Sequence, residues 1–299
     1  MKTDFLMRSL MFVPAHNERL MNSAVKSNAD VLLLDIEDSV LPKENKQVAR
    51  DMIFKYVTNG IFKNRIIFPR VNDRESGELL KDVHQLTIDG IAGFMYPKSQ
   101  KGEDVYFFGK LLETIEHEKN IPIGTFKIIP LIETAGAVMN IQEICMACPN
   151  RVIAVAFGCE DFVTDLGGQQ DKEGKSLFTA RNMIAMGARA TGVVPIDTVH
   201  INVHDLEDLE RNLIISKKLG YEGMMILNPK ELALCHKYYS PSEEQVEWAE
   251  EILELAVEAQ KEGKGVAIKG NKFIGPPMVK MAKDILAKNE LIRMKNISF

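Results

Sequence analysis

Acidic side chains and one arginine stand directly after apolar segments at four places in the sequence. They are Asp35 and Glu37 in DIED, Arg70 in PRVN, Glu133 in LIET and Asp161 in GCED. Two carboxylates with open positions beside them suit Mg²⁺, which prefers oxygen ligands and keeps several waters, whereas Zn²⁺ would want His or Cys. A guanidinium beside such an ion holds a carboxylate in a bidentate fork. Together these groups would form an electrophilic pocket for a 2-oxo acid or an enolate.

The segments that carry these residues alternate with amphipathic stretches along most of the chain. Uninterrupted apolar runs such as VLLL and VIAVAF indicate strands buried on both faces, as in a parallel sheet. The predicted strands are Ser9–Pro14, Val31–Ile36, Arg65–Val71, Gly90–Tyr96, Lys127–Ile132, Val152–Phe157, Val194–Ile201 and Gly223–Leu227. The predicted helices are Glu18–Asn28, Glu44–Thr58, Glu78–Leu86, Glu103–Glu118, Ala135–Ala147, Phe178–Ala190 and Leu206–Leu219. This alternation predicts an α/β fold, a (β/α)₈ TIM barrel.

The barrel prediction gathers the polar residues at one rim. Active sites of such barrels lie at the carboxyl ends of the strands. Glu133 and Asp161 follow adjacent predicted strands, so their oxygens can meet at one cation, which also relieves their repulsion. Two plainer interpretations stay open at this point. A single carboxylate at a strand end often caps a helix or is solvated, and Arg70 could pair with a structural acid.

The sequence changes character after Tyr239. We expect a barrel over residues 1–239 and a separate helical extension over 240–299. A long charged helix is predicted over 243–262, a segment rich in Gly and Pro over 263–277, and a last helix from 278 to about 291. We interpret this extension as a lid over the barrel mouth, either of its own subunit or of a neighbouring one.

Composition excludes several classes of protein. The 299 residues include 37 Lys and Arg against 42 Asp and Glu, a net charge of −5, which argues against a nucleic-acid partner. No apolar run approaches the ~18 residues of a membrane span, and Asp4 and Arg8 interrupt the N-terminal apolar residues, unlike a signal peptide. Four cysteines in a chain of this length are unlike a secreted disulfide scaffold, so we expect a cytoplasmic protein.

Several motifs, in order and at barrel-like spacing, resemble those of the HpcH/HpaI aldolase/citrate lyase superfamily, which includes citrate lyase beta subunits and malyl-CoA and citramalyl-CoA lyases. They are RSLMFVPA, ADVLLLDIEDSV, PRVN, LIET, VAFGCEDF and GMMILNP. The resemblance runs from Arg8 to about Ile292. It implies a barrel with a C-terminal lid, Mg²⁺ as cofactor, and a homo-oligomer, most often a trimer. The implied substrate is an oxo acid or an acyl thioester of coenzyme A or of an acyl carrier protein.

The same resemblance implies roles for the rim residues. Glu133 and Asp161 would ligate the metal, Arg70 would bind the substrate's carboxylate or oxygen, and Glu133 would also lie against the substrate. Asp35 and Glu37 would support the arginine and metal-bound water, completing a catalytic set with Arg70. The implied reaction is a retro-Claisen cleavage of a 3-hydroxy-acyl thioester, citryl-, citramalyl- or malyl-like. A base takes the 3-hydroxyl proton, the carbon–carbon bond breaks, and the acetyl-thioester enolate is protonated.

Three positions depart from the family pattern. In the lyases the lid carries a catalytic acid in a Gly-Lys-Met-Val-Asp-like segment, which corresponds here to NKFIG over 271–275, with Gly275 in place of the acid. The Gly-Lys expected in the loop after strand 8 is Gly223–Met224, and helix 1 lacks the usual lysine near Ser23.

These departures keep other functions open, because glycine cannot transfer a proton. The chain could be an aldolase or thioesterase that acts on related oxo acids or acyl-CoA. It could also be a catalytically silent subunit that binds oxo acids. Glu37, Asp38 and His16 are the candidate substitutes for the missing lid acid.

Overall fold

The computed structural model describes residues 4–171, 174–261, 266–269 and 272–297. The chain divides into two compact units, and the division falls inside helix α10 (Leu232–Tyr239). One unit spans Met7–Cys235 and is called the barrel unit here. The other contains residues 4–6 and the chain from His236 onward and is called the C-terminal unit.

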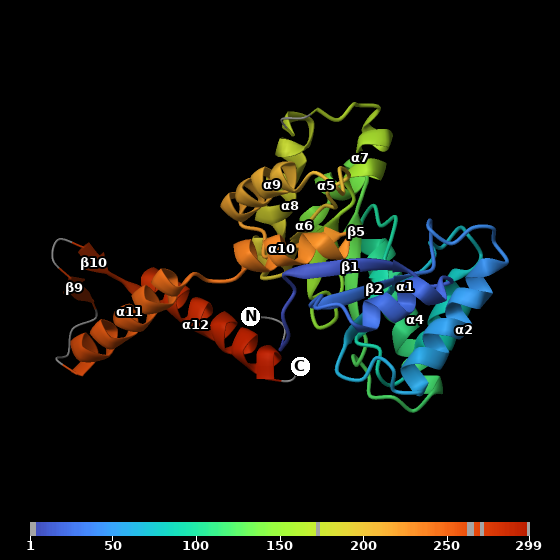
Figure 1. Cartoon of the computed structure of the whole chain (residues 1–299), viewed down its shortest axis with the longest axis horizontal. Helices are drawn as coiled ribbons and strands as arrows, with labels where there is room; N and C mark the ends of the chain where they lie inside the picture. Colours follow the sequence, from blue (N-terminus) through green and yellow to red (C-terminus); the bar gives the residue numbers. More distant parts are fainter. Residues whose placement is uncertain (1–3, 172–173, 262–265, 270–271, 298–299) are drawn as a thin grey trace. The chain divides into compact units, whose positions relative to one another are not determined.

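Eight parallel strands of the barrel unit close into a barrel in sequence order (Figure 1). They are β1 (Ser9–Pro14), β2 (Val31–Asp35), β3 (Ile66–Arg70), β4 (Gly93–Tyr96), β5 (Lys127–Ile132), β6 (Ala154–Phe157), β7 (Val194–Asp197) and β8 (Gly223–Ile226). The structure confirms the (β/α)₈ barrel. Several strands are shorter than their apolar runs, and β5 and β6 pair through only two residues each.

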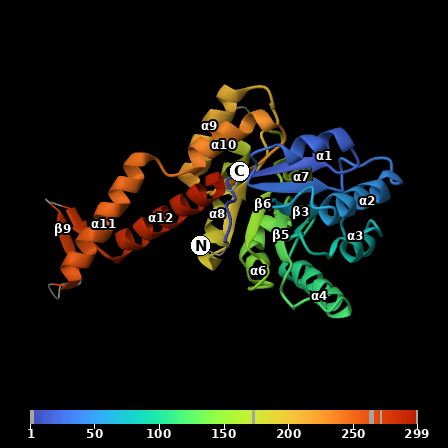
Figure 2. The ribbon, with the colours of Figure 1, turned by 60° about the horizontal axis from the view of Figure 1, so that its bottom comes forward.

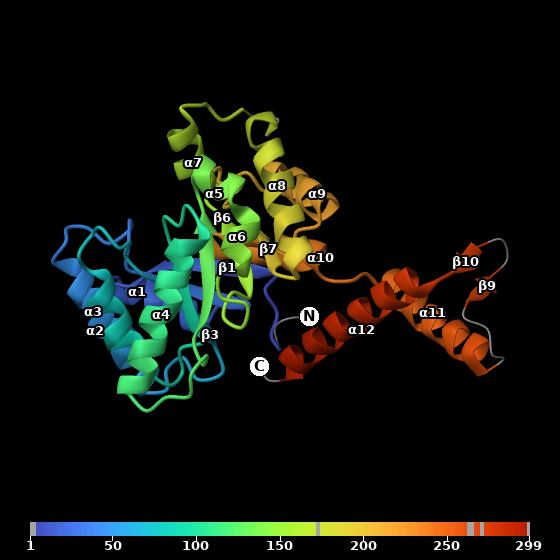
Figure 3. The same ribbon diagram turned by 180° about the vertical axis from the view of Figure 1, so that it is seen from behind.

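Helices connect the strands and lie outside them (Figures 2 and 3). Neighbouring helices contact one another, α2 with α3, α4 with α6 and α6 with α8. The helices are α1 (Glu18–Val25), α2 (Asn45–Thr58), α3 (Leu79–Leu86), α4 (Gly102–Glu118), α5 (Ala135–Met139), α6 (Ile141–Met146), α7 (Cys159–Leu166), α8 (Lys175–Thr191) and α9 (Leu206–Leu219). A short 3₁₀ helix, η1 (Pro229–Glu231), precedes α10.

Two helix predictions were wrong in ways that matter for the barrel mouth. The predicted helix Ala135–Ala147 is broken at Asn140, which ends α5 and begins α6. The Asn140 side-chain amide donates to the Gln100 carbonyl at 3.0 Å, which fixes this break against the loop before α4. Helix α7 was not predicted, since it is only two turns long and carries charged residues that we assigned to a strand end.

The interior of the barrel unit explains why its strands read as continuous apolar runs. The side chains of β2 from Val31 to Leu34 are fully buried, and so are those of β6. Each face of a strand contacts either the barrel interior or the surrounding helices, so no position can be polar without a partner. The polar side chains are thereby restricted to the strand ends, where the candidate site lies.

The C-terminal unit contains a helix pair and a small hairpin. Helices α11 (Glu243–Lys261) and α12 (Pro276–Ile297) pack together, and β9 (Ala267–Lys269) pairs antiparallel with β10 (Lys272–Ile274). Its core contains Ala249, Ile252, Ile274 and Ala282. The hairpin was not predicted because its strands have three residues each. The last helix begins earlier than predicted, since prolines are favourable in a first helical turn.

Two sequence expectations concern the whole chain. Within the described ranges, no helix is both long and apolar enough to cross a bilayer. All four cysteines are free thiols, and Cys145, Cys159 and Cys235 are buried.

Glu231 is a buried carboxylate in the barrel unit. Its side chain ends η1 with no solvent exposure. One oxygen accepts the Leu227 amide at 3.2 Å, while the other has no hydrogen-bond partner among the described residues. Burial raises the pKa of Glu231 to about 7, which means that folding favours the neutral carboxyl.

We expect Glu231→Gln to stabilise the protein at alkaline pH and to change little at acidic pH. The folded-state pKa lies above the ordinary value of 4.5. The neutral carboxyl of the wild type therefore contributes its full stability below pH 4.5. This contribution is lost as the pH rises through 7, and above that pH the free energy of unfolding changes no further on account of Glu231. Urea unfolding of both proteins from pH 5 to 8.5 should show a variant advantage that grows by about 2 kcal/mol. A difference independent of pH would contradict this assignment.

Candidate active site

Strands β2 and β3 place Asp35 beside Arg70, because the two residues are register partners at the strand ends. The Arg70 Nε lies 2.7 Å from Asp35 Oδ1, and Nη2 lies 2.8 Å from Oδ2. The Glu37 and Ser39 amides also donate to Asp35. Burial alone would raise the pKa of Asp35, but the guanidinium and these donors outweigh it and hold the pKa below its ordinary value. Asp35 is therefore a charged anchor that fixes the arginine.

Glu37 lies between two cations in the loop after β2. Arg70 Nη1 is 3.1 Å from Glu37 Oε2, and Lys98 Nζ is 3.3 Å from Oε1. Neither oxygen has an aligned hydrogen bond among the described residues, although both cations are within ion-pair distance. Burial raises the pKa of Glu37 to about 7, against the opposing charge of Arg70. Glu37 can therefore take up or release a proton near neutral pH.

Glu133 follows β5 and is 2% exposed. The Lys98 amide donates to its Oε1. Burial, followed by the nearby charge of Glu37, raises the pKa of Glu133 to about 8, and Asp161 adds to the effect. Burial and the neighbouring carboxylates therefore disfavour the ionised form of Glu133, and a bound cation would stabilise that form.

Asp161 lines the same cavity as Glu133 and follows β6, the next strand of the barrel. It lies in the first turn of α7, which begins directly after β6, and its side chain is exposed. The prediction that it ends a strand was wrong, but the prediction that it shares a rim with Glu133 holds, since both line one cavity. Ile132 and Phe157 pair at the ends of β5 and β6, which brings the two chain segments together.

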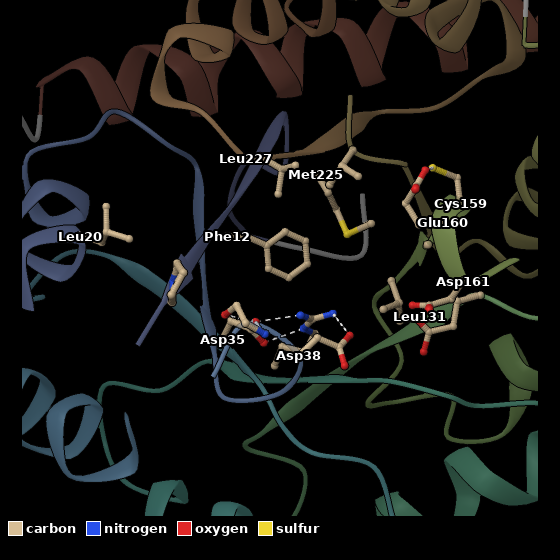
Figure 4. Close-up of a pocket in the computed structure, with 16 residues that line it drawn as sticks. Phe12, Leu20, Asp35, Asp38, Leu131, Cys159, Glu160, Asp161, Met225 and Leu227 are labelled. Atoms are coloured by element: carbon tan, nitrogen blue, oxygen red, sulfur yellow. Dashed lines mark hydrogen bonds and ion pairs between the residues drawn. The ribbon is translucent and has the colours of Figure 1, made fainter. Parts of the chain in front are cut away.

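The cavity has a volume of about 400 Å³ and is lined by both charged and apolar side chains (Figure 4). Figure 4 shows Asp35 and Asp38 together at one side and Asp161 at the other. The Arg70 guanidinium lies 4.9 Å from the centroid of the Phe12 ring, a cation–π contact. The apolar lining consists of Phe12, Leu20, Leu131, Val199, Met225 and Leu227. A ligand with a charged head and an apolar or neutral remainder fits this mixed lining.

A second, more polar cavity of about 910 Å³ shares Glu133 and Asp161 with the first. Its other lining residues include Asp73, Tyr96 and Lys98. The carboxylate pair therefore forms a wall between two cavities.

The donor set suits a hard divalent cation. Within the described residues, no three His, Cys, Asp or Glu side chains are grouped as a metal site. Glu133 and Asp161 would thus supply two protein ligands, and waters or substrate oxygens would complete the shell, which is typical of Mg²⁺. A cation at this place would offset the burial and the neighbouring carboxylates that disfavour the ionised form of Glu133.

Cys159 also lines the first cavity, at the start of α7. The thiol is buried, and burial raises its pKa to about 11. It is therefore protonated at neutral pH and contributes surface rather than a nucleophile.

The structure also places the residues at which the sequence departs from the family pattern. Met224 lies within β8 and is buried, so its expected position in a loop was wrong. Ser23 lies on α1 and is exposed, so a substrate carrier or another binding partner can reach this position. Asp38 lines the first cavity, whereas His16 does not. Asn271, the first residue of the NKFIG segment, lies outside the described residues.

Comparison with known proteins identifies the family. Residues 8–229 match the profile of the HpcH/HpaI aldolase/citrate lyase family. The chain belongs to this family. It is 31% identical over 283 residues to the citrate lyase subunit beta of Haemophilus influenzae, covering 95% of this chain and 97% of that one. It is 28% identical over 298 residues to the human mitochondrial citramalyl-CoA lyase, covering 96% and 87%.

Solved structures agree on the fold of this family. A citrate lyase from Burkholderia xenovorans superposes with a TM-score of 0.82 at 18% identity, covering 94% of this chain and 91% of that one. The protein CitE from Mycobacterium tuberculosis, crystallised with magnesium, acetoacetate and coenzyme A, gives 0.71 at 22% identity, covering 97% and 100%.

Gly158 gives a test of the geometry around Glu133. A Cβ at Gly158 would lie 2.8 Å from Glu133 Cβ and 3.0 Å from Oε2. We expect Gly158→Ala to displace the Glu133 side chain and weaken Mn²⁺ binding by about tenfold while the fold persists. Electron paramagnetic resonance of Mn²⁺ measures the affinity. Gly168→Ala, where the nearest neighbours leave ordinary space, is the matched control, and equal affinities in both variants would contradict the assignment.

Proposed function

We propose that this chain is a Mg²⁺-dependent carbon–carbon lyase of the citrate lyase beta subunit type. Its reaction would be the retro-Claisen cleavage of a 3-hydroxy-acyl thioester to an oxo acid and an acetyl thioester. The observation that carries the proposal is an arginine paired through two donors with a buried aspartate, in the same cavity as two carboxylates suited to a divalent cation. Relatives named citrate lyase subunit beta and citramalyl-CoA lyase support it.

Binding of the metal and of the substrate falls to separate residues. Glu133 and Asp161 would hold Mg²⁺, which when bound supplies positive charge to a developing oxo group. Arg70, oriented by Asp35, would hold the substrate carboxylate in a bidentate fork. Mycobacterial relatives solved with magnesium and oxaloacetate, or with magnesium and pyruvate, bind ligands of this class.

Proton transfer falls to Glu37 in this proposal. A general base works best when its pKa is close to the working pH, and burial gives Glu37 a pKa of about 7. Its carboxylate would take the 3-hydroxyl proton as the bond to the 2-carbon breaks and the thioester enolate forms. The Glu37 carboxyl would then return this proton to the 2-carbon, which gives the acetyl thioester. The apolar side of the cavity, at Phe12 and Met225, would face the uncharged part of the substrate and exclude water.

Gly275 favours a second candidate function. It stands between β10 and α12, where the lyase pattern has an acid. Without that acid, water could attack the polarised thioester carbonyl, or the enolate of an oxo acid could add to an aldehyde. The alternatives are therefore a thioesterase or an aldolase on related oxo acids or acyl-CoA, or a silent subunit that binds oxo acids.

A substrate panel with two variants separates these functions. Purified protein is incubated with citramalyl-, malyl- and citryl-CoA, with and without Mg²⁺, as wild type, Gly275→Asp and Gly275→Asn. Asparagine matches aspartate in size but has no ionisable group. A side chain at position 275 must displace the exposed Phe273 ring, which lies 2.7 Å from where the new Cβ would stand, equally in both variants.

Mg²⁺-dependent release of an oxo acid by wild type supports the lyase. A gain in Gly275→Asp alone shows that the lid acid was the missing group. Thioester hydrolysis without carbon–carbon cleavage would establish the thioesterase. Binding of an oxo acid with no turnover of any thioester would exclude both the lyase and the thioesterase.

We further propose a cytoplasmic homotrimer in which the C-terminal unit acts as the lid of a barrel. The composition, with four free thiols, supports a reducing compartment. Sedimentation should give about 100 kDa, three chains of 33.6 kDa. A monomer under assay conditions would overturn the trimer.

A further inference from the structure

Lys98 has an uncommon backbone conformation at the mouth of the barrel. It follows β4 after Pro97 and has a φ of 54°, in the left-handed region that a residue with a Cβ rarely adopts. This conformation lets the Lys98 amide donate to Glu133 Oε1. Glycine would adopt it at lower cost, so a lysine at this position indicates that its side chain has a role. Strain of this kind collects at functional sites.

The Lys98 side chain contacts a second carboxylate of the site. Its Nζ lies 3.3 Å from Glu37 Oε1 and 3.4 Å from Asp73 Oδ2. Arg70 approaches the other oxygen of Glu37 at 3.1 Å. The ammonium therefore shares Glu37 with the arginine, so that Arg70 does not have to balance Asp35 and Glu37 alone.

Lys98 and Arg70 line different cavities, although both contact Glu37. Lys98 lines the second cavity, whereas Arg70 lines the first, and Glu133 and Asp161 line both. The Lys98 amide occupies Oε1 of Glu133. The other oxygen, Oε2, is the one close to Gly158, from which α7 and Asp161 start.

We propose that Lys98 is a positioning residue for both halves of the reaction centre. Its amide selects Oε2 of Glu133 as the oxygen left for the cation, and its ammonium balances Glu37 so that an anionic substrate can approach Arg70. The proposal rests on the proposed function, because it assigns Lys98 to the same cation and oxo-acid site. It predicts opposite effects on the two ligands when the ammonium is removed, since a nearby positive charge repels a cation and attracts an anion.

The test measures binding of each ligand separately. Lys98→Met keeps the backbone amide and the length of the side chain but removes the charge. Mn²⁺ affinity, measured by electron paramagnetic resonance on metal-free protein, should stay equal or become tighter. Pyruvate affinity, measured by calorimetry with Mn²⁺ present, should weaken by about tenfold. A merely structural role would weaken both.

Three further variants make the result decisive. Lys98→Arg should restore most of the pyruvate affinity. Lys98→Gly relieves the backbone strain and should match Lys98→Met in pyruvate binding without a loss of melting temperature. Lys101→Met removes a neighbouring ammonium that pairs with Glu103 instead, and should change neither affinity by more than about twofold.

Parallel weakening of Mn²⁺ and pyruvate, or no change in either, overturns the role of Lys98. These readouts do not depend on turnover, so a wild type that cleaves no thioester would overturn the proposed function and leave this test intact.

Discussion

Glu133→Gln is expected to abolish tight Mg²⁺ binding and to lower turnover by about 10³-fold. The amide has the size of the carboxylate, and its oxygen can still accept the Lys98 amide, so the barrel should remain folded. What disappears is the negative charge that attracts the cation. Because burial disfavours the ionised form of Glu133, the neutral variant should also be at least as stable as wild type without metal.

In Glu133→Gln, metal affinity and turnover should therefore fall, whereas the melting temperature of the metal-free protein should not. Mn²⁺ titration, oxo-acid release and thermal unfolding measure the three quantities. Glu113→Gln removes a carboxylate from an exposed pair with Lys110 on α4 and serves as the control. Retained Mn²⁺ affinity in Glu133→Gln would show that the cation binds elsewhere.

Arg70→Lys is expected to lower kcat/KM by at least about 10²-fold even though it keeps the charge. Lysine cannot supply two parallel donors to Asp35 and leaves the planar contact with Phe12. Asp35 is fully buried, so a poorly paired carboxylate should also reduce the free energy of unfolding by about 1–3 kcal/mol.

The Arg70→Lys effects can be checked by steady-state kinetics and urea unfolding. Arg189→Lys makes the same exchange in an ion pair with Glu222 on the surface, where little change is expected. If Arg70→Lys loses activity but keeps the full free energy of unfolding, the two hydrogen bonds from Arg70 to Asp35 orient the guanidinium for the substrate and do not stabilise the fold. Unchanged kcat/KM would remove Arg70 from the site.

The barrel was predictable because its strands are buried on both faces. Runs such as Val31–Leu34 must lie between the barrel interior and the helices, and no turn residue interrupts them. Helix α7 and the split at Asn140 were not predictable in the same way. Both involve contacts with residues distant in the sequence, from Asn140 to Gln100 and from the Cys159 amide to Thr198 Oγ1, which no local pattern records.

The site was predictable to the extent that strand ends define it. Arg70, Asp35, Glu133 and Asp161 were expected at one rim because they follow predicted strands, and all four line one cavity, although the secondary structure of Asp161 was wrong. Lys98 was missed, although it follows β4 and the same rule applies to it. Its amide, rather than its side chain, contacts Glu133. A backbone donor in a left-handed conformation cannot be recognised from the residue type.

The high pKa of the Cys159 thiol has a practical consequence for assays. A sulfhydryl that is buried and protonated at neutral pH reacts slowly with disulfide dyes. Burial likewise raises the pKa values of the Cys148 and Cys235 thiols. Free coenzyme A released by hydrolysis can then be followed by its colour reaction with such a dye in the presence of the native enzyme. Carbon–carbon cleavage leaves coenzyme A as a thioester, so this reaction distinguishes the two activities directly.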